Sequence, residues 1–212
     1  MAFPLYRTSV VWVLITAAVS YELQAQPAPD DPPQVRKAAH VSSATGELGE
    51  LRTNLYRNAF FGFTCKVPYG WVERTAQMRD PDDSGKSLLL LTVFEHPPEV
   101  TASTINSAIV IAAERISAYS GLKTAADYLG PITELSTSKG FHTEGEPYEF
   151  QAGQKRLVRA DFSKPRGSLN MYQGSLVTLE KGYALSFTFI AGSKDELAEL
   201  VENLSFGTRK NY

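Results

Sequence analysis

The fold is decided by the stretch "NAFFGFTCKVPYGW", Asn58 to Trp71, in which apolar and polar residues alternate before the chain turns. Period-two alternation predicts a strand with one buried face. That face would carry Phe61, Phe63, Cys65 and Val67. The tripeptide Pro68-Tyr69-Gly70 then predicts a tight turn. We interpret the stretch as the opening strand of a sheet, with Cys65 as a small core side chain rather than a reactive thiol.

Residues 1–25, upstream of this strand, have the pattern of a secretory signal peptide. Arg7 is the only charge before Glu22, and the segment between them, "TSVVWVLITAAVS", has the length of a signal-peptide apolar region. It is short for a bilayer span. Ala25 is the small residue expected before a cleavage site. We therefore expect a cleaved signal, a periplasmic or secreted protein, and no membrane span after cleavage; the alternative is an uncleaved anchor.

Composition limits the remaining possibilities. The 212 residues carry a formal net charge of −2, with 43% apolar and 21% charged residues. These values are ordinary for a globular protein, and the chain lacks the excess of positive charge that is typical of nucleic-acid-binding proteins. Cys65 is the only cysteine, so the chain cannot form an internal disulfide. We expect a single domain that is stabilised by its core alone and has no nucleic-acid partner.

The chain divides into four segments. After the signal, residues 26–50 are rich in proline and lack an apolar cluster, which predicts a flexible tether. Residues 51–207 predict one folded domain, and residues 208–212 a short tail. Within the domain, "SLLLLTVFEHP" (87–97) is typical of a central strand buried on both faces, and "NSAIVIAAERI" (106–116) also predicts a strand. Two hairpins are predicted to turn at 152–154 and 180–182.

Two helices are predicted. The segment 121–140 would be capped by Thr124 and kinked or interrupted by Pro131. The segment 193–206 opens with Ser193 and Glu196 at capping-box spacing and continues with an apolar stripe. Together the elements predict an α+β fold, an antiparallel sheet of about six or seven strands with helices packed on its faces.

Candidate sites for chemistry are few. His142, Glu144 and Glu146 alternate, so an extended segment would place all three on one face, where they could bind Zn²⁺ or Mn²⁺. The alternative is an ordinary solvated strand face. His96 is followed by two prolines, and no serine lies in a G-x-S-x-G motif. We predict no catalytic residues and no cofactor, and rank a hydrolase last among the possible functions.

Aromatic residues indicate binding more than catalysis. Tyr69 and Trp71 lie around the first turn, and Tyr148 and Tyr172 lie in the hairpins. Most aromatics in such positions pack on the core, but exposed ones anchor interfaces. We take these four as candidate binding residues.

Two segments resemble the PsbP-like family. "YRNAFFGFTCKVPYGW" (56–71) resembles the opening of its domains, and "KGYALSFTFIAGSKDELAELVENLSF" (181–206) resembles their close. The resemblance covers about residues 51–207 and implies an α/β/α sandwich. It also implies a non-enzymatic accessory role, since the family includes extrinsic subunits of the oxygen-evolving complex, bacterial envelope proteins and a nuclear-transport cofactor. No metal ligand carries over. We expect an accessory module that docks on an envelope or secreted protein, or alternatively a carrier of a small ligand or divalent metal.

Overall fold

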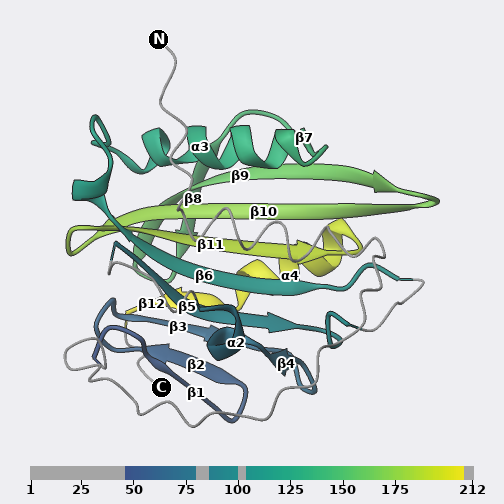
Figure 1. Ribbon diagram of the computed structural model, residues 1–212, viewed down its shortest axis with the longest axis horizontal. Coiled ribbons are helices and arrows are strands. Elements are labelled where there is room, and N and C mark those ends of the chain that lie inside the picture. Colours follow the sequence, from purple (N-terminus) through teal and green to yellow (C-terminus); the bar gives the residue numbers. More distant parts are fainter. Residues whose placement is uncertain (1–45, 80–85, 100–103, 208–212) are drawn as a thin grey trace, which may run out of the picture.

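The computed structural model describes residues 46–79, 86–99 and 104–207. The predicted signal peptide, residues 26–45 of the predicted tether and the predicted tail lie outside this part of the chain. The described residues form the α+β fold that the sequence predicts, with strands in the majority (Figure 1).

The larger sheet has eight antiparallel strands, one or two more than predicted. Their order is β4-β5-β6-β11-β10-β9-β7, and β8 pairs with β9 beside β7. Their bounds are β4 Val72–Glu73, β5 Ser87–Phe94, β6 Ala108–Arg115, β7 His142–Thr143, β8 Tyr148–Ala152, β9 Lys155–Arg166, β10 Leu169–Glu180 and β11 Tyr183–Ala191. The two predicted strands at 87–97 and 106–116 are β5 and β6. Both are almost wholly buried, but β5 lies next to the edge strand β4 rather than at the centre.

Three tight turns make β8 to β11 a continuous meander. The two predicted turns are confirmed, because Ala152 pairs with Lys155 and Glu180 with Tyr183 across two-residue connections. A third turn joins Arg166 to Leu169 and was not predicted. At the β10–β11 turn, Lys181 and Gly182 both have positive φ values, 50° and 81°, which is the backbone that matches the twist of a two-residue hairpin.

A second sheet of four strands, in the order β1-β2-β3-β12, packs beside the first. Its bounds are β1 Glu50–Arg52, β2 Leu55–Asn58, β3 Phe63–Lys66 and β12 Leu204–Phe206. Of the stretch Asn58–Trp71, only Phe63–Lys66 is a strand, β3, and it belongs to this smaller sheet. Asn58 ends β2, and residues 59–62, with Phe61 among them, form the turn between the two strands, so the predicted strand begins too early and is the third strand of the chain rather than the first. Phe61, Phe63, Cys65 and Val67 are all buried, as predicted. β12 pairs antiparallel with β3, which brings the two ends of the domain together.

Four helical segments complete the described fold: α2 Thr75–Met78, the 3-10 turn η1 Ile116–Ala118, α3 Ala125–Ser138 and α4 Lys194–Glu202. Thr124 caps α3, as predicted. Of the two effects predicted for Pro131, a kink or an interruption, the interruption is wrong, since α3 continues through this residue. Pro131 is exposed and removes a single backbone donor, while Tyr128 and Ile132 hold the helix against the sheet.

The two long helices cover opposite faces of the large sheet. Along β11, Leu185, Phe187 and Phe189 join the core that contains α4 and the small sheet. Ala184 and Ile190, of the other parity, join the core under α3. Because successive strand residues point to opposite faces, the molecule is layered as α3, large sheet, and then α4 with the small sheet.

The folded part extends four residues further upstream than predicted. Residues 47–50 were assigned to the tether, but Glu50 begins β1 and the Glu47 carbonyl accepts a hydrogen bond of 2.8 Å from the Asn58 amide. The Leu48 carbonyl accepts from the Tyr56 hydroxyl. Apolar content alone could not reveal these polar anchors.

Candidate functional site

A surface of aromatic and charged side chains lies beside α4, on the face of the large sheet that α4 covers. Directly opposite residues of an antiparallel pair point to the same face, and Arg159 faces Tyr148 across the β8–β9 pair, while Ser163 faces Tyr172 across β9–β10. We call this the α4–β8 surface and define it by Tyr148, Phe150, Arg159, Asp161, Tyr172 and Lys194.

Its centre is a hydrogen-bonded triplet. The Tyr148 hydroxyl donates to one oxygen of Asp161 at 2.8 Å, and Arg159 Nε donates to the other at 2.8 Å. The side chains of Arg159 and Asp161 are only 11% and 19% exposed, so this pair is shielded from solvent. Burial and the Asp161 contact raise the pKa of Tyr148, which keeps the hydroxyl a donor.

The same guanidinium fixes two aromatic rings. Arg159 lies 5.7 Å from the ring centre of Tyr148 and 5.5 Å from that of Phe150. Such cation–π contacts hold the rings in place without burying them. Tyr148 remains 44% exposed.

Gly174 on β10 makes room for this arrangement. A Cβ at that position would lie 3.2 Å from Asp161 Oδ1 and 3.4 Å from Leu197 of α4. The glycine therefore lets the Asp161 carboxylate and the helix approach the same point of the sheet.

A second charged pair lies at the N-terminus of α4. Lys194 Nζ donates to Glu144 at 2.8 Å and lies 5.6 Å from the ring centre of Tyr172. Ser163 donates to the other oxygen of Glu144 at 2.6 Å. The Lys194 contact, followed by that of Ser163, lowers the pKa of Glu144, and Glu144 in turn raises the pKa of Lys194.

An open hollow of about 330 Å³ adjoins this pair, between the β9–β10 turn and the start of α4. It is lined by Ser168, Leu169, Asn170, Tyr172, Gly192, Ser193, Lys194 and Asp195. Leu169 is 39% exposed at its rim.

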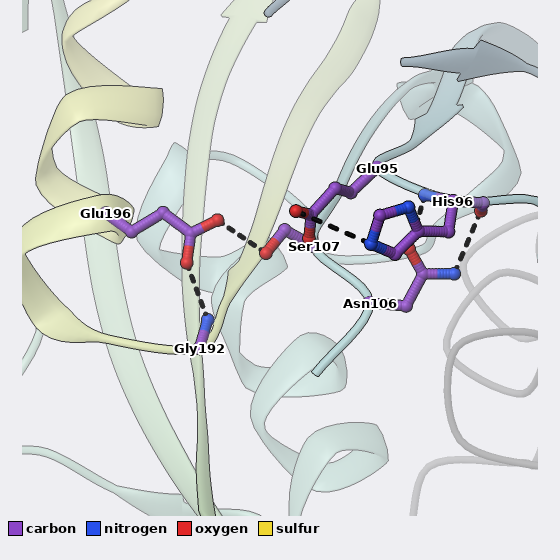
Figure 2. A network of polar contacts seen from close by, with 6 residues as sticks. All are labelled: Glu95, His96, Asn106, Ser107, Gly192 and Glu196. Carbon is purple, nitrogen blue, oxygen red and sulfur yellow. Dashed lines mark hydrogen bonds and ion pairs between the residues drawn. The ribbon is translucent and has the colours of Figure 1, made fainter. Parts of the chain in front are cut away.

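The other flank of α4 is tied to the segment between β5 and β6 (Figure 2). Glu196 accepts from the Ser107 hydroxyl at 2.5 Å and from the Gly192 amide at 2.9 Å. Next to Ser107, the Asn106 side chain bonds both the backbone N–H and the carbonyl of His96. The network places α4 firmly on the sheet from this side.

The network does not join the His96 imidazole to the Ser107 hydroxyl. His96 Nε2 lies 3.6 Å from Glu95, beyond hydrogen-bond length, and the Ser107 hydroxyl donates to Glu196 rather than to His96 (Figure 2). Ser107 is also buried. Cys65 is fully buried as predicted, and burial raises the pKa of its thiol to about 12, which leaves it protonated and unreactive.

The four predicted binding residues fall into two places. Tyr148 and Tyr172 both belong to the α4–β8 surface, on strands β8 and β10 at either side of β9. Tyr69 and Trp71 lie apart, around the turn before β4, where Tyr69 is 94% exposed and Trp71 packs partly on the core.

The predicted metal ligands are not gathered into a ligand set. Glu144 is engaged by Lys194 and Ser163, while His142 and Glu146 are exposed. In the described ranges, no three His, Cys, Asp or Glu side chains form a group that could hold a metal ion.

Sequence reasoning missed Arg159, Asp161 and Lys194. A signal for the first two was present, because residues two apart on a strand share a face and carry opposite charges here. Lys194 could not be found this way, since it comes from a helix 33 residues beyond Asp161 in the sequence.

Comparisons with known proteins give similarities of structure only. No protein-family model matches the chain, and no curated protein matches it in sequence. Cyanobacterial PsbP from Synechocystis is 13% identical, with 77% of this chain and 99% of that chain covered and a TM-score of 0.46. LpqN of Mycobacterium tuberculosis, a protein involved in cell envelope biogenesis, is 13% identical, with 69% and 83% covered and a TM-score of 0.41. A Bacteroides thetaiotaomicron protein is 13% identical, with a TM-score of 0.37. The match covers 71% of this chain but only 47% of the length of the Bacteroides protein. These values do not place the chain in a family, so PsbP-like membership remains a resemblance in two segments.

Across residues 46–79, 86–99 and 104–207, no helix is both long and apolar enough to cross a bilayer.

Proposed function

We propose that the protein is an exported, non-enzymatic binding module that docks on an envelope or secreted protein through the α4–β8 surface. The observation that carries the proposal is the fixed arrangement of Tyr148, Phe150 and Arg159. Two partly exposed rings and a guanidinium are already held in one geometry by Asp161.

Preorganised aromatics favour binding for a physical reason. Interface residues that carry most of the binding energy are enriched in Tyr, Trp and Arg. Each flexible side chain that is ordered on binding costs about 0.5–1.5 kcal/mol, and a surface that is ordered beforehand avoids this loss. Tyr69, which is exposed on a turn without such contacts among the described residues, lacks this advantage.

The position of the upstream segment also supports docking at this place. Glu47 contacts the Tyr183 hydroxyl at 3.2 Å, at the start of β11. Tyr172 pairs with Ala191, at the other end of that nine-residue strand, roughly 27 Å away at the usual rise per residue. Glu47, near the start of the described part of the chain, therefore lies at the end of β11 opposite Tyr172 and does not cover that residue.

Site-specific photo-crosslinking in the native envelope tests the proposal. A photoreactive amino acid at Ala198, exposed on α4, should capture one dominant protein, whereas the same group at Glu134, exposed on α3, should not. Tyr148→Ser should reduce capture from Ala198 at least tenfold, and Tyr69→Ser should leave it unchanged. Capture that is equal at the two positions, or lost with Tyr69→Ser alone, would reject the α4–β8 surface as the docking site.

The hollow at the start of α4 favours a second candidate, a small-ligand carrier. A volume of about 330 Å³ lies at the lower end for small-molecule sites, which are usually more enclosed and more apolar than this one. Protein docking therefore remains the better supported function. If a small molecule co-purifies with the protein from an envelope extract and no protein is crosslinked, the small-ligand carrier becomes the better supported function.

A further inference from the structure

We infer that the partner presents a basic segment to this protein, one that carries apolar side chains as well as lysine or arginine. The inference rests on the proposed function and adds the chemistry of the occupant. It starts from the charges on and beside the α4–β8 surface.

The two cations of the surface are balanced, one by Asp161 within it and the other by Glu144 next to it. Arg159 pairs with Asp161 and Lys194 with Glu144, both at 2.8 Å. What a partner meets at the centre is therefore aromatic and electrically balanced. The sign of the electrostatic potential that a partner meets here is therefore set by the neighbouring side chains.

The neighbouring outer side of α4 is acidic. Leu197, Leu200 and Val201 face the core, so the 100° step per residue points Asp195, Glu199 and Glu202 away from the sheet. All three are exposed, and none has an ion pair within the part of the chain that the structure describes. The helix that lies beside the aromatic centre thus carries three unpaired carboxylates on its solvent side.

Two of these three carboxylates, at the C-terminal end of α4, are unfavourable for the helix itself. Glu199 and Glu202 lie in the last turn, where the helix dipole is negative, and that turn has no basic residue. Asp195 and Glu199 are four residues apart, and Glu199 and Glu202 three apart, so like charges also repel along the surface. Side chains that oppose local stability are expected where a binding function requires them.

A basic segment fits both features. Cations on the partner would approach the three carboxylates, and the same cations or their apolar neighbours would contact the rings of Tyr148, which is exposed, and Tyr172, which is half-buried. An acidic partner, an anionic membrane surface or a nucleic acid would be repelled by the same carboxylates.

The test uses two defined peptides and the full chain. One is a blocked Lys-Phe-Lys-Phe-Lys peptide and the other its Glu-Phe-Glu-Phe-Glu counterpart, so that apolar content is equal and only the charge differs. Binding is followed by the amide signals of the isotope-labelled protein. The basic peptide should shift signals of Ala198, Tyr148 and Tyr172, and the acidic peptide should bind at least fivefold more weakly.

A matched pair of variants separates charge from damage to the fold. Glu199→Lys should weaken the basic peptide about fivefold while raising the melting temperature, because it relieves the repulsion at the helix end. Glu134→Lys makes the same change on α3 and should leave peptide binding unchanged. A loss of binding together with a gain in stability cannot be attributed to misfolding.

Three outcomes would overturn the inference: equal binding of both peptides, an equal effect of the two variants, or self-association of the free chain through the same signals. In each of these cases, capture from Ala198 that still depends on Tyr148 would leave the proposed docking function standing.

Discussion

α3 and α4 begin with similar sequence patterns but are anchored in different ways. In α3, Thr124 and Asp127 form a complete capping box, in which Asp127 accepts from the Thr124 amide at 2.7 Å. In α4, Ser193 caps the Glu196 amide at 3.1 Å, but the Glu196 carboxylate does not return to Ser193. The Glu196 carboxylate instead accepts hydrogen bonds from the Gly192 amide and from the hydroxyl of Ser107, which is 89 residues away in the sequence.

The difference shows that the first turn of α3 is stabilised by its own residues, whereas the first turn of α4 is stabilised by a contact with the segment that precedes β6. α3 covers its face as a self-contained layer. α4 is held on one flank by Ser107 and on the other by the Lys194–Glu144 pair. The helix that borders the proposed docking surface is thus fixed by contacts distant in sequence, which preorganises the surface.

The largest expected effect comes from removing one core ring on each face. Phe187 and Phe162 are both fully buried, but Phe187 also meets the rings of Phe63 at 5.1 Å and Phe206 at 5.8 Å, and so connects the two sheets. Phe187→Ala should lower the free energy of unfolding by about 4–5 kcal/mol, and Phe162→Ala by about 3 kcal/mol. Urea denaturation measures both. An equal or larger loss for Phe162→Ala would show that the α4 side is not the more strongly connected face.

The next effect concerns the two helix starts. Ser107→Ala removes a buried hydrogen bond to a carboxylate and should lower the free energy of unfolding by about 2 kcal/mol. Thr124→Ala removes an exposed cap and should lower it by about 1 kcal/mol.

Hydrogen exchange locates the two effects. With Ser107→Ala, protection should fall in the first turn of α4 and in the segment after β5, whereas Thr124→Ala should act on α3 alone. If Ser107→Ala leaves the exchange protection of the α4 amides unchanged, the hydrogen bond between Ser107 and Glu196 does not stabilise the start of α4.

Local patterns predicted the elements of the fold well. Alternation identified the strand around Cys65, which is fully buried, and the turn residues located two of the three turns in the β8–β11 meander. These succeed because burial parity and turn backbone depend on neighbouring residues. The split into two sheets was not predictable in the same way, because β12 pairs with β3 across most of the domain.

The candidate site was only half predictable, for the same physical reason. Tyr148 and Tyr172 were found by residue type alone. Asp161 contacts Tyr148 because of the register of β8 on β9, and Lys194 contacts Glu144 because of the position of α4 on the sheet. Neither arrangement can be seen in a local stretch of sequence. The Ser193–Glu196 spacing predicted a capping box, and only half of it forms because Ser107 offers Glu196 a buried donor.

The smallest expected effect is on acid titration. Backbone hydrogen bonds from Lys123 and Thr124 lower the pKa of Asp127 below its ordinary value of 3.8. A carboxyl group whose pKa is lower in the folded than in the unfolded state stabilises the fold above that ordinary value, and the contribution is lost as the pH falls further through the folded pKa. The amide signals of Lys123 and Thr124 should therefore hold their positions down to about pH 4 and shift below it, and Asp127→Asn should abolish the shift. If the shift persists in Asp127→Asn, the amides of Lys123 and Thr124 report another carboxyl group, and the self-contained character of the α3 cap is disproved.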